Sequence, residues 1–187
     1  MPLDRTQLRG TLLVEDRRTE RFFRNLLVHL GFDKRKFNFR IAPSGRGDAS
    51  VWVRSQYPAE VNLVRRKRHQ RLCLITVRDG DRFGVTLRKI DLDTALSDSG
   101  FDRRQARERI ATPVPTWSIE TWLLFLLGDD ALDERVTRKH EFEQGYSSEE
   151  GRTLRDAARA WRYRATGVPS MQSLTDGYEE LGRIDSA

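Results

Sequence analysis

Two aspartates separated by one glycine, Asp79 and Asp81, closely follow the unbroken apolar run of residues 72–77. Such a short run of strand-forming residues predicts a strand buried on both faces, which is typical of a central parallel strand. In extended chain, residues two apart point to the same side, so we expect both carboxylates to face one spot. Neighbouring carboxylates repel each other unless a proton or a cation lies between them. Because open α/β sheets bind ligands at the carboxyl ends of their strands, the pattern predicts a divalent metal site.

A second acidic group follows another predicted strand. Glu15 comes directly after the apolar residues 11–14, and Glu20 lies at the start of the helix that follows. If the two strands are neighbours, these carboxylates and the two aspartates converge on one edge of the sheet. Oxygen ligands of this kind suit Mg²⁺ or Mn²⁺, and two such ions can polarise a phosphodiester. The alternative is that these acids are ordinary loop residues, since many strands end in acidic loops.

The positive charge of the chain favours a polyanionic partner. The net charge is +6 and the sequence pI is about 9.9, which fits binding to DNA or RNA. Ser44 and Arg46 belong to a glycine-rich loop that suits a phosphate, although an ordinary turn has the same composition. The densest basic run is predicted to contact nucleic-acid phosphates, with a solvated helix end as the alternative. This run consists of Arg65, Arg66, Lys67 and Arg68.

The elements that must position these residues alternate along the chain. Apolar patterns predict strands at 11–14, 37–41 and 72–77, with helices at 19–30 and 51–64 between them. This order predicts a doubly wound α/β sheet. A helix over 87–96, a short edge strand near 110–114 and an apolar helix over 117–128 complete a predicted α/β domain of residues 1–128. Residues 129–187 are expected to form a helical extension of three amphipathic helices packed on it.

Both acidic segments resemble a TOPRIM domain, the Mg²⁺-dependent module of topoisomerases, primases and OLD-family nucleases. The matching residues are Leu-Leu-Val-Glu15-Asp-Arg-Arg-Thr-Glu20 and Val-Arg-Asp79-Gly-Asp81-Arg-Phe-Gly84. The family signature is a strand-end glutamate, followed later by a strand that ends in Asp-x-Asp. The Glu-x-x-x-Thr-Glu spacing and the segment around Glu120 are similar to small RloB-like TOPRIM proteins of bacterial anti-phage systems. The resemblance covers roughly residues 10–128.

The resemblance implies a Rossmann-like fold and assigns roles to single residues. Glu15 would act as the general acid/base or as a metal ligand, while Asp79 and Asp81 would hold Mg²⁺. Glu20 would add a ligand, and Glu120 would be a further acidic ligand at the rim of the site. The implied activity is metal-dependent cleavage of nucleic-acid phosphodiesters in anti-phage defence, beside a separately encoded ABC-type ATPase. The chain lacks the Gly-x-x-x-x-Gly-Lys-Ser/Thr phosphate loop, so an ATP-driven step would need that second subunit.

Two other interpretations stay open. Asp16 stands where the family usually has glycine, and it would either crowd the phosphate or supply another ligand. Crowding would favour a catalytically silent module that binds metal or nucleic acid as a subunit of an ATPase complex. The opening Leu-Leu-Val-Glu-Asp also resembles a receiver-type phosphoacceptor domain. The receiver interpretation fits less well, because Asp79 lies 64 residues beyond Glu15 and no late strand ends in Lys-Pro.

The single cysteine, Cys73, lies within the apolar run 72–77, which predicts a buried thiol and excludes a disulfide framework within the chain. The sequence has no apolar segment of the length that a membrane-spanning helix or a signal peptide needs. We therefore expect a soluble, cytoplasmic protein with no membrane partner.

Overall fold

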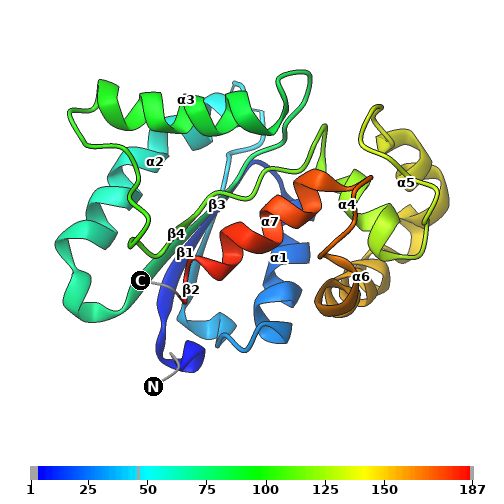
Figure 1. The fold of residues 1–187 in the computed structure, drawn as a ribbon, viewed down its shortest axis with the longest axis horizontal. Helices are drawn as coiled ribbons and strands as arrows, with labels where there is room; N and C mark the ends of the chain where they lie inside the picture. The colour runs from blue at the N-terminus through cyan, green and yellow to red at the C-terminus, as the bar shows by residue number, and fades with distance from the viewer. Residues whose placement is uncertain (1–3, 46, 186–187) are drawn as a thin grey trace.

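The structure is built on one parallel sheet. In the computed structural model, which describes residues 4–45 and 47–185, four strands pair in the order β2-β1-β3-β4 (Figure 1). The strands are β1 (Arg9–Val14), β2 (Phe37–Ile41), β3 (Leu72–Val77) and β4 (Ile110–Ala111). A helix joins each strand to the next, as parallel pairing requires. The predicted parallel α/β sheet is confirmed: β3 has its predicted bounds and β4 lies at the edge.

The register of the sheet brings the ends of β1 and β3 together. The two strands pair residue for residue, from Arg9 with Leu72 to Val14 with Val77. Val14 also pairs with Ile41 of β2, so three strands end at the same level. The condition set by the sequence, that the two acid-bearing strands are neighbours, is therefore confirmed.

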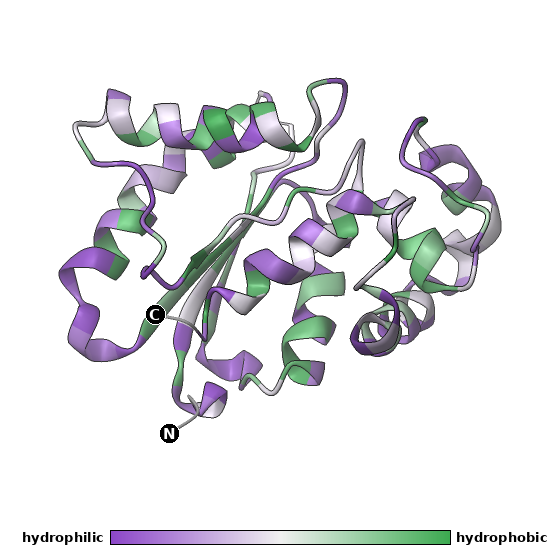
Figure 2. Cartoon of the chain, viewed as in Figure 1, coloured by the Kyte–Doolittle hydropathy of each residue, from purple (hydrophilic) through white to green (hydrophobic). Residues whose placement is uncertain are grey.

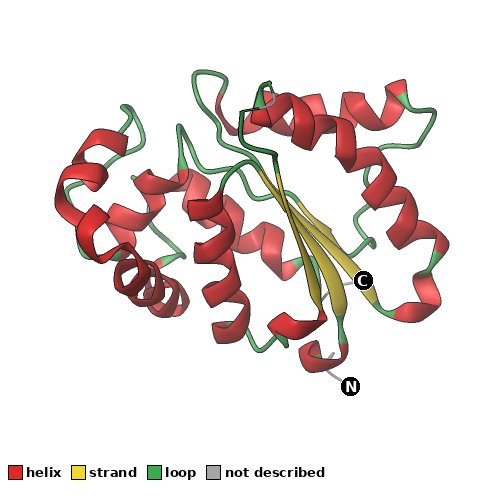
Figure 3. Ribbon diagram, turned by 180° about the vertical axis from the view of Figure 1, so that it is seen from behind, coloured by secondary structure: helices red, strands yellow, loops and turns green. Residues whose placement is uncertain are grey.

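Helices cover both faces of the sheet, because alternate strand residues point to opposite sides. Leu12 and Ile75 belong to the core on one face, against which α1 (Arg17–His29) packs. Leu13 and Leu74 belong to a second core with α2 (Ala49–Arg66) and α3 (Gly84–Asp98). Figure 3, seen from behind, shows the strands passing between these two helical layers.

The part of the chain after β4 is helical and completes the first core. It contains α4 (Ile119–Leu126), α5 (Lys139–Tyr146), α6 (Glu150–Arg164) and α7 (Gln172–Gly182). The three amphipathic helices predicted after residue 128 are thus confirmed as α5, α6 and α7. The Trp161 ring of α6 lies 5.6 Å from Trp122 of α4 and 6.1 Å from Phe22 of α1. The helices after β4 therefore share one apolar core with the sheet.

Short 3-10 turns lie between several of the helices and strands. Single 3-10 turns occur at η1 (Arg5–Gln7), η2 (Lys34–Lys36), η3 (Arg68–Gln70) and η4 (Ser147–Glu149). Figure 2 shows apolar strands at the centre and a hydrophilic corner where α2 passes through η3 into β3. Among residues 4–45 and 47–185, no helix has both the length and the apolar character needed to cross a bilayer.

Candidate functional site

The Asp79 carboxyl is the most perturbed acid at the carboxyl edge of the sheet. It keeps some solvent contact, yet protein surrounds it on most sides, and this desolvation is the largest cause that raises its pKa well above the usual value. The remaining causes are all like charges, from the carboxylates of Glu15, Asp16, Glu120 and Asp81. Within the described part of the chain, no side chain donates a hydrogen bond to this carboxyl to offset them. The environment of Asp79 therefore favours either a proton or an added cation.

Glu15 lies beside Asp79 because β1 and β3 are in register. Burial raises the pKa of Glu15, although the nearby Ser50 hydroxyl and the charges of Arg78 and Arg88 act to lower it. Its Oε1 atom is buried and makes no hydrogen bond within the described residues. The nearest cation is Arg78, whose Nε lies 3.6 Å from that oxygen. Glu15 therefore has an acceptor atom that the protein leaves unsatisfied.

The turn after β3 positions Asp81 in a way that the sequence did not predict. Asp81 has a left-handed backbone with φ of 46°, so the expected extended chain from Asp79 to Asp81 is wrong. The turn is held by hydrogen bonds from Gly80 N to Pro115 O and from Asp81 N to Trp117 O, both 2.8 Å. A Cβ at Gly80 would lie 2.8 Å from the Pro115 oxygen, which explains why glycine is needed there.

Two arginines supply positive charge next to these acids. Arg88 donates to Asp81 Oδ2 at 2.5 Å and to the Asp79 carbonyl at 2.9 Å. Arg78 is 2% exposed and donates to Asp91 Oδ2 and to Ser50 Oγ, both at 2.6 Å. Sequence reasoning missed both arginines, because the partners of Arg78 lie on α2 and α3, and Arg88 reaches from α3 back to the turn after β3. Only the position of Arg78 between the apolar run and Asp79 gave a signal.

An open cleft of about 710 Å³ adjoins this cluster. Its wall includes the first turn of α2, which Asp48 caps by accepting hydrogen bonds from Ser50 N at 2.8 Å and Val51 N at 3.4 Å. Glu15 and Asp81 line the cleft together with four arginines, Arg54, Arg78, Arg82 and Arg88. Acidic and basic groups therefore meet in one cleft, a combination that could hold a metal-bound anionic substrate.

Glu20 and Glu120, the other two predicted ligands, each have a cation of their own. Glu20 accepts a hydrogen bond of 2.6 Å from Arg24 Nε, one helical turn away on α1. Glu120 is 4% exposed and pairs with Arg18, which also lies 3.4 Å from Glu150. Glu120 still raises the pKa of Asp79, but its own charge is compensated. The structure thus places Glu15 beside Asp79, whereas Glu20 and Glu120 are each hydrogen-bonded to a cation.

Asp16 has a different role from either of those expected for it. Its carboxylate caps α1, accepting hydrogen bonds of 2.9 Å from both Thr19 N and Thr19 Oγ1. A capping carboxylate is held at the helix N-terminus and satisfies a free backbone N–H group there. The residue that departs from the family pattern therefore stabilises the helix that follows Glu15.

The donor set fits a magnesium ion in chemistry but not as a closed cage. Within residues 4–45 and 47–185, no three His, Cys, Asp or Glu side chains are grouped as a metal site requires. Mg²⁺, however, is commonly held by one or two carboxylates while waters and substrate phosphates complete its shell. Glu15, with its unsatisfied buried oxygen, and Asp79, with its uncompensated charge, match that description.

The predicted phosphate-binding residues are separated by the sheet. Ser44 is exposed in the loop after β2, at the same edge as the acids, and Arg46 lies outside the described residues. The basic run from Arg65 to Arg68 ends α2 and precedes β3, so it lies at the opposite, amino edge. It therefore cannot contact the same phosphate as Asp79.

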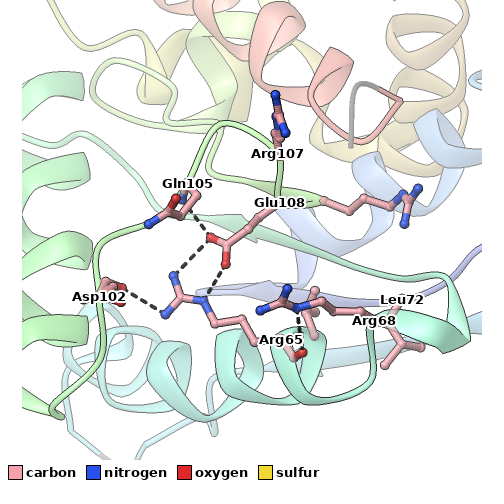
Figure 4. Close-up of a pocket in the computed structure, with 9 residues that line it drawn as sticks. Arg65, Arg68, Leu72, Asp102, Gln105, Arg107 and Glu108 are labelled. Atoms are coloured by element: carbon pink, nitrogen blue, oxygen red, sulfur yellow. Dashed lines mark hydrogen bonds and ion pairs between the residues drawn. The ribbon is translucent and has the colours of Figure 1, made fainter.

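Arg65 is engaged within the protein, in a pocket of about 520 Å³ at the amino edge (Figure 4). Its Nε donates to Glu108 Oε1 at 2.5 Å, and its Nη1 donates to the Asp102 carbonyl at 2.9 Å. In Figure 4 the Arg65 and Glu108 side chains point toward one another, whereas Arg107 points away. Arg66, Lys67 and Arg68 of the same run are exposed.

Comparisons with known proteins leave the family open. No protein-family model, no curated protein and no solved structure matches this chain. The fold itself, a parallel sheet with helices on both faces, is consistent with a Rossmann-like architecture.

Proposed function

We propose that this chain is a Mg²⁺- or Mn²⁺-dependent nuclease that cleaves phosphodiesters of DNA or RNA at the carboxyl edge of its sheet. The observation that carries the proposal is the pair Glu15 and Asp79, two adjacent carboxyls whose pKa values are both raised. Burying like charges together is unfavourable for folding, and such arrangements cluster at functional sites. The TOPRIM resemblance of the same residues supports this choice of activity.

Each residue at this edge has a part in the proposed reaction. Asp79 and Glu15 hold the ion, and Asp81 adds a carboxylate from the turn. A bound divalent ion supplies Lewis-acid polarisation of the scissile phosphate. When it does not ligate the ion, Glu15, whose pKa is raised by burial, is suited to proton transfer. Exposed Arg82 lines the cleft and holds the nucleic-acid backbone.

A nuclease assay tests the proposal directly. Plasmid, single-stranded DNA and total RNA are each incubated with the protein in Mg²⁺, in Mn²⁺ and in chelator. We expect metal-dependent cutting of at least one polymer, which Asp79→Asn and Glu15→Gln abolish. Glu179→Gln, an exposed acid on α7, is the matched control and should cut like the wild type. If the wild type cuts no polymer with either metal, the chain is not a nuclease on its own.

The Arg88–Asp81 ion pair favours a second candidate, a catalytically silent module. Arg88 already neutralises one of the two aspartates, which reduces the charge left for a metal. Such a module would bind nucleic acid in a salt-sensitive way without cutting it. As a subunit of an ABC-type ATPase complex in anti-phage defence, it would co-purify with an ATP-hydrolysing protein from the cells that encode it. Binding without cleavage, together with that co-purification, would select this candidate.

A further inference from the structure

The solvent-facing side of α3 is mostly uncharged: its exposed charged residue is Asp98 at the last position, and Asp93, three positions after Ile90, is partly exposed. Its exposed positions recur at helical spacing from the turn before the helix to its last turn, namely Phe83, Thr86, Leu87, Ile90, Thr94 and Ser97. The three large apolar side chains, Phe83, Leu87 and Ile90, are 46%, 54% and 52% exposed. One third of all residues in this chain are charged, so three exposed apolar side chains on one helix face are unexpected.

The two hydroxyl groups near the end of this face are satisfied within the helix. Thr94 Oγ1 donates to Ile90 O at 2.9 Å, and Ser97 Oγ donates to Asp93 O at 3.2 Å. They therefore do not depend on water, so covering these two hydroxyl groups costs little free energy. The exposed face of α6 contrasts with it, since that helix presents Arg152, Arg155, Arg159 and Arg162.

Opposite charges flank the two ends of the α3 face. Arg82, in the turn before the helix, is exposed and forms no ion pair with a carboxylate of the described residues. Asp98, the last residue of the helix, pairs with Arg54 at 2.9 Å but keeps 61% of its side chain exposed. A face that is positive at one end and negative at the other is complementary to a copy of itself turned by 180°.

We propose that α3 is the interface of a two-fold symmetric dimer of this chain, with the helices antiparallel and the axis near Ile90. Arg82 and Asp98 both lie eight positions from Ile90, so each arginine would be level with the aspartate of the other copy. Ile90 would meet its own copy at the axis, flanked by the two Leu87 side chains. Val51 on α2 is 61% exposed and lines the same cleft as Phe83, so it adds to the exposed apolar surface near α3.

The size of the patch sets the strength of the dimer. A helix of 15 residues is about 22 Å long at 1.5 Å per residue. One such helix face and its neighbours reach only the low end of the roughly 800 Å² per partner that specific interfaces bury. The dimer is therefore concentration-dependent. It would bring the two Arg82 positions, and with them the mouths of the two clefts, roughly 24 Å apart along the helix pair.

Analytical ultracentrifugation over a range of concentrations tests the interface. The wild type should dimerise as the concentration rises, and Ile90→Lys should stay monomeric because both copies place a lysine at the axis. Ile90 is exposed, so the variant should keep the circular dichroism spectrum and melting temperature of the wild type. Tyr163→Lys on α6, where the residue is 81% exposed, is the control and should dimerise normally. A monomeric wild type, or a dimeric Ile90→Lys, would overturn the proposal.

A charge exchange tests the antiparallel arrangement. Arg82→Glu or Asp98→Lys alone should weaken the dimer roughly tenfold, since a two-fold dimer contains the Arg82–Asp98 pair twice and each variant disrupts both copies of it. The combined variant should recover most of the wild-type affinity. If the combined variant is weaker than both single variants, the two residues do not face each other and the arrangement is wrong. The Ile90→Lys and Asp98→Lys measurements need no nuclease activity and change no residue of the proposed site, so they stand apart from the proposed function; Arg82 also lines the cleft, so Arg82→Glu is read only together with them.

Discussion

Replacing Glu180 by glutamine removes a buried negative charge that connects α7 to the sheet edge. Glu180 is 7% exposed and pairs with Arg104, and its carboxylate accepts a hydrogen bond of 2.9 Å from Thr112 N. Lys89 adds an ion pair at 3.1 Å. Burial alone would raise the pKa of Glu180. The hydrogen bond and positive charge of Arg104, the backbone hydrogen bond from Thr112 and the charge of Lys89 outweigh burial and lower this pKa to about 2.

This lowered pKa gives the size of the expected loss. A folded-state pKa of about 2 against an ordinary value of 4.5 corresponds to about 3 kcal/mol of stability at pH 7, at about 1.4 kcal/mol per pKa unit. Removing one partner of a buried ion pair typically costs about 3–5 kcal/mol, which agrees. Because the folded pKa lies below the unfolded one, this stability is present above pH 4.5 and is lost as the pH falls toward 2.

Urea unfolding followed by circular dichroism measures the effect. At pH 7 we expect Glu180→Gln to be less stable than the wild type by about 3 kcal/mol, and at pH 3.5 the difference should shrink to about 2 kcal/mol. Glu179→Gln, the exposed neighbour on the same helix, should unfold like the wild type at both pH values. A difference below about 1 kcal/mol at pH 7, or one that grows on acidification, would refute the reasoning.

Three further predictions concern single residues near the sheet. Asp16→Ala should destabilise the protein by about 1 kcal/mol in urea unfolding, whereas Asp16→Ser, which keeps a capping oxygen, should not. Gly80→Ala should displace the Asp79–Asp81 turn from the Pro115 carbonyl, and it should weaken Mg²⁺ binding in calorimetry while leaving the far-UV spectrum unchanged. Cys73 has its pKa raised to about 12 by burial, so iodoacetamide at pH 8 should label it only after denaturation, as mass spectrometry can show.

The fold was predictable where local pattern and tertiary structure agree. Residues 72–77 are apolar without interruption, and the structure has β3 at the same bounds because that strand is buried on both faces. The stripe that includes Phe22 and Phe23 predicted a helix, and both side chains are fully buried on α1. In these segments one periodicity decides both the element and the face that it buries.

The site was less predictable, because its charges depend on partners far apart in the sequence. Strand order put Glu15 next to Asp79, and the resemblance already paired them. No local pattern shows that Arg18 neutralises Glu120, more than 100 residues away, or that Arg88 holds Asp81. The left-handed backbone of Asp81 likewise depends on docking against residues 115–117. Counter-charges and strained turns come from tertiary contacts, which short-range spacing does not encode.

The shared core of the sheet and the last helices has a consequence for how the chain reaches its folded state during synthesis. Strand residues such as Leu12 and Ile75 leave the ribosome early, yet Trp161, Leu174 and Ile184 complete the core that covers them. Until those late residues emerge, one face of the nascent sheet is left partly uncovered, and exposed apolar surface of this kind promotes aggregation. The protein should therefore reach its stable state only after translation of its last helix, and chaperones that bind apolar segments should associate with ribosomes that have not yet completed it.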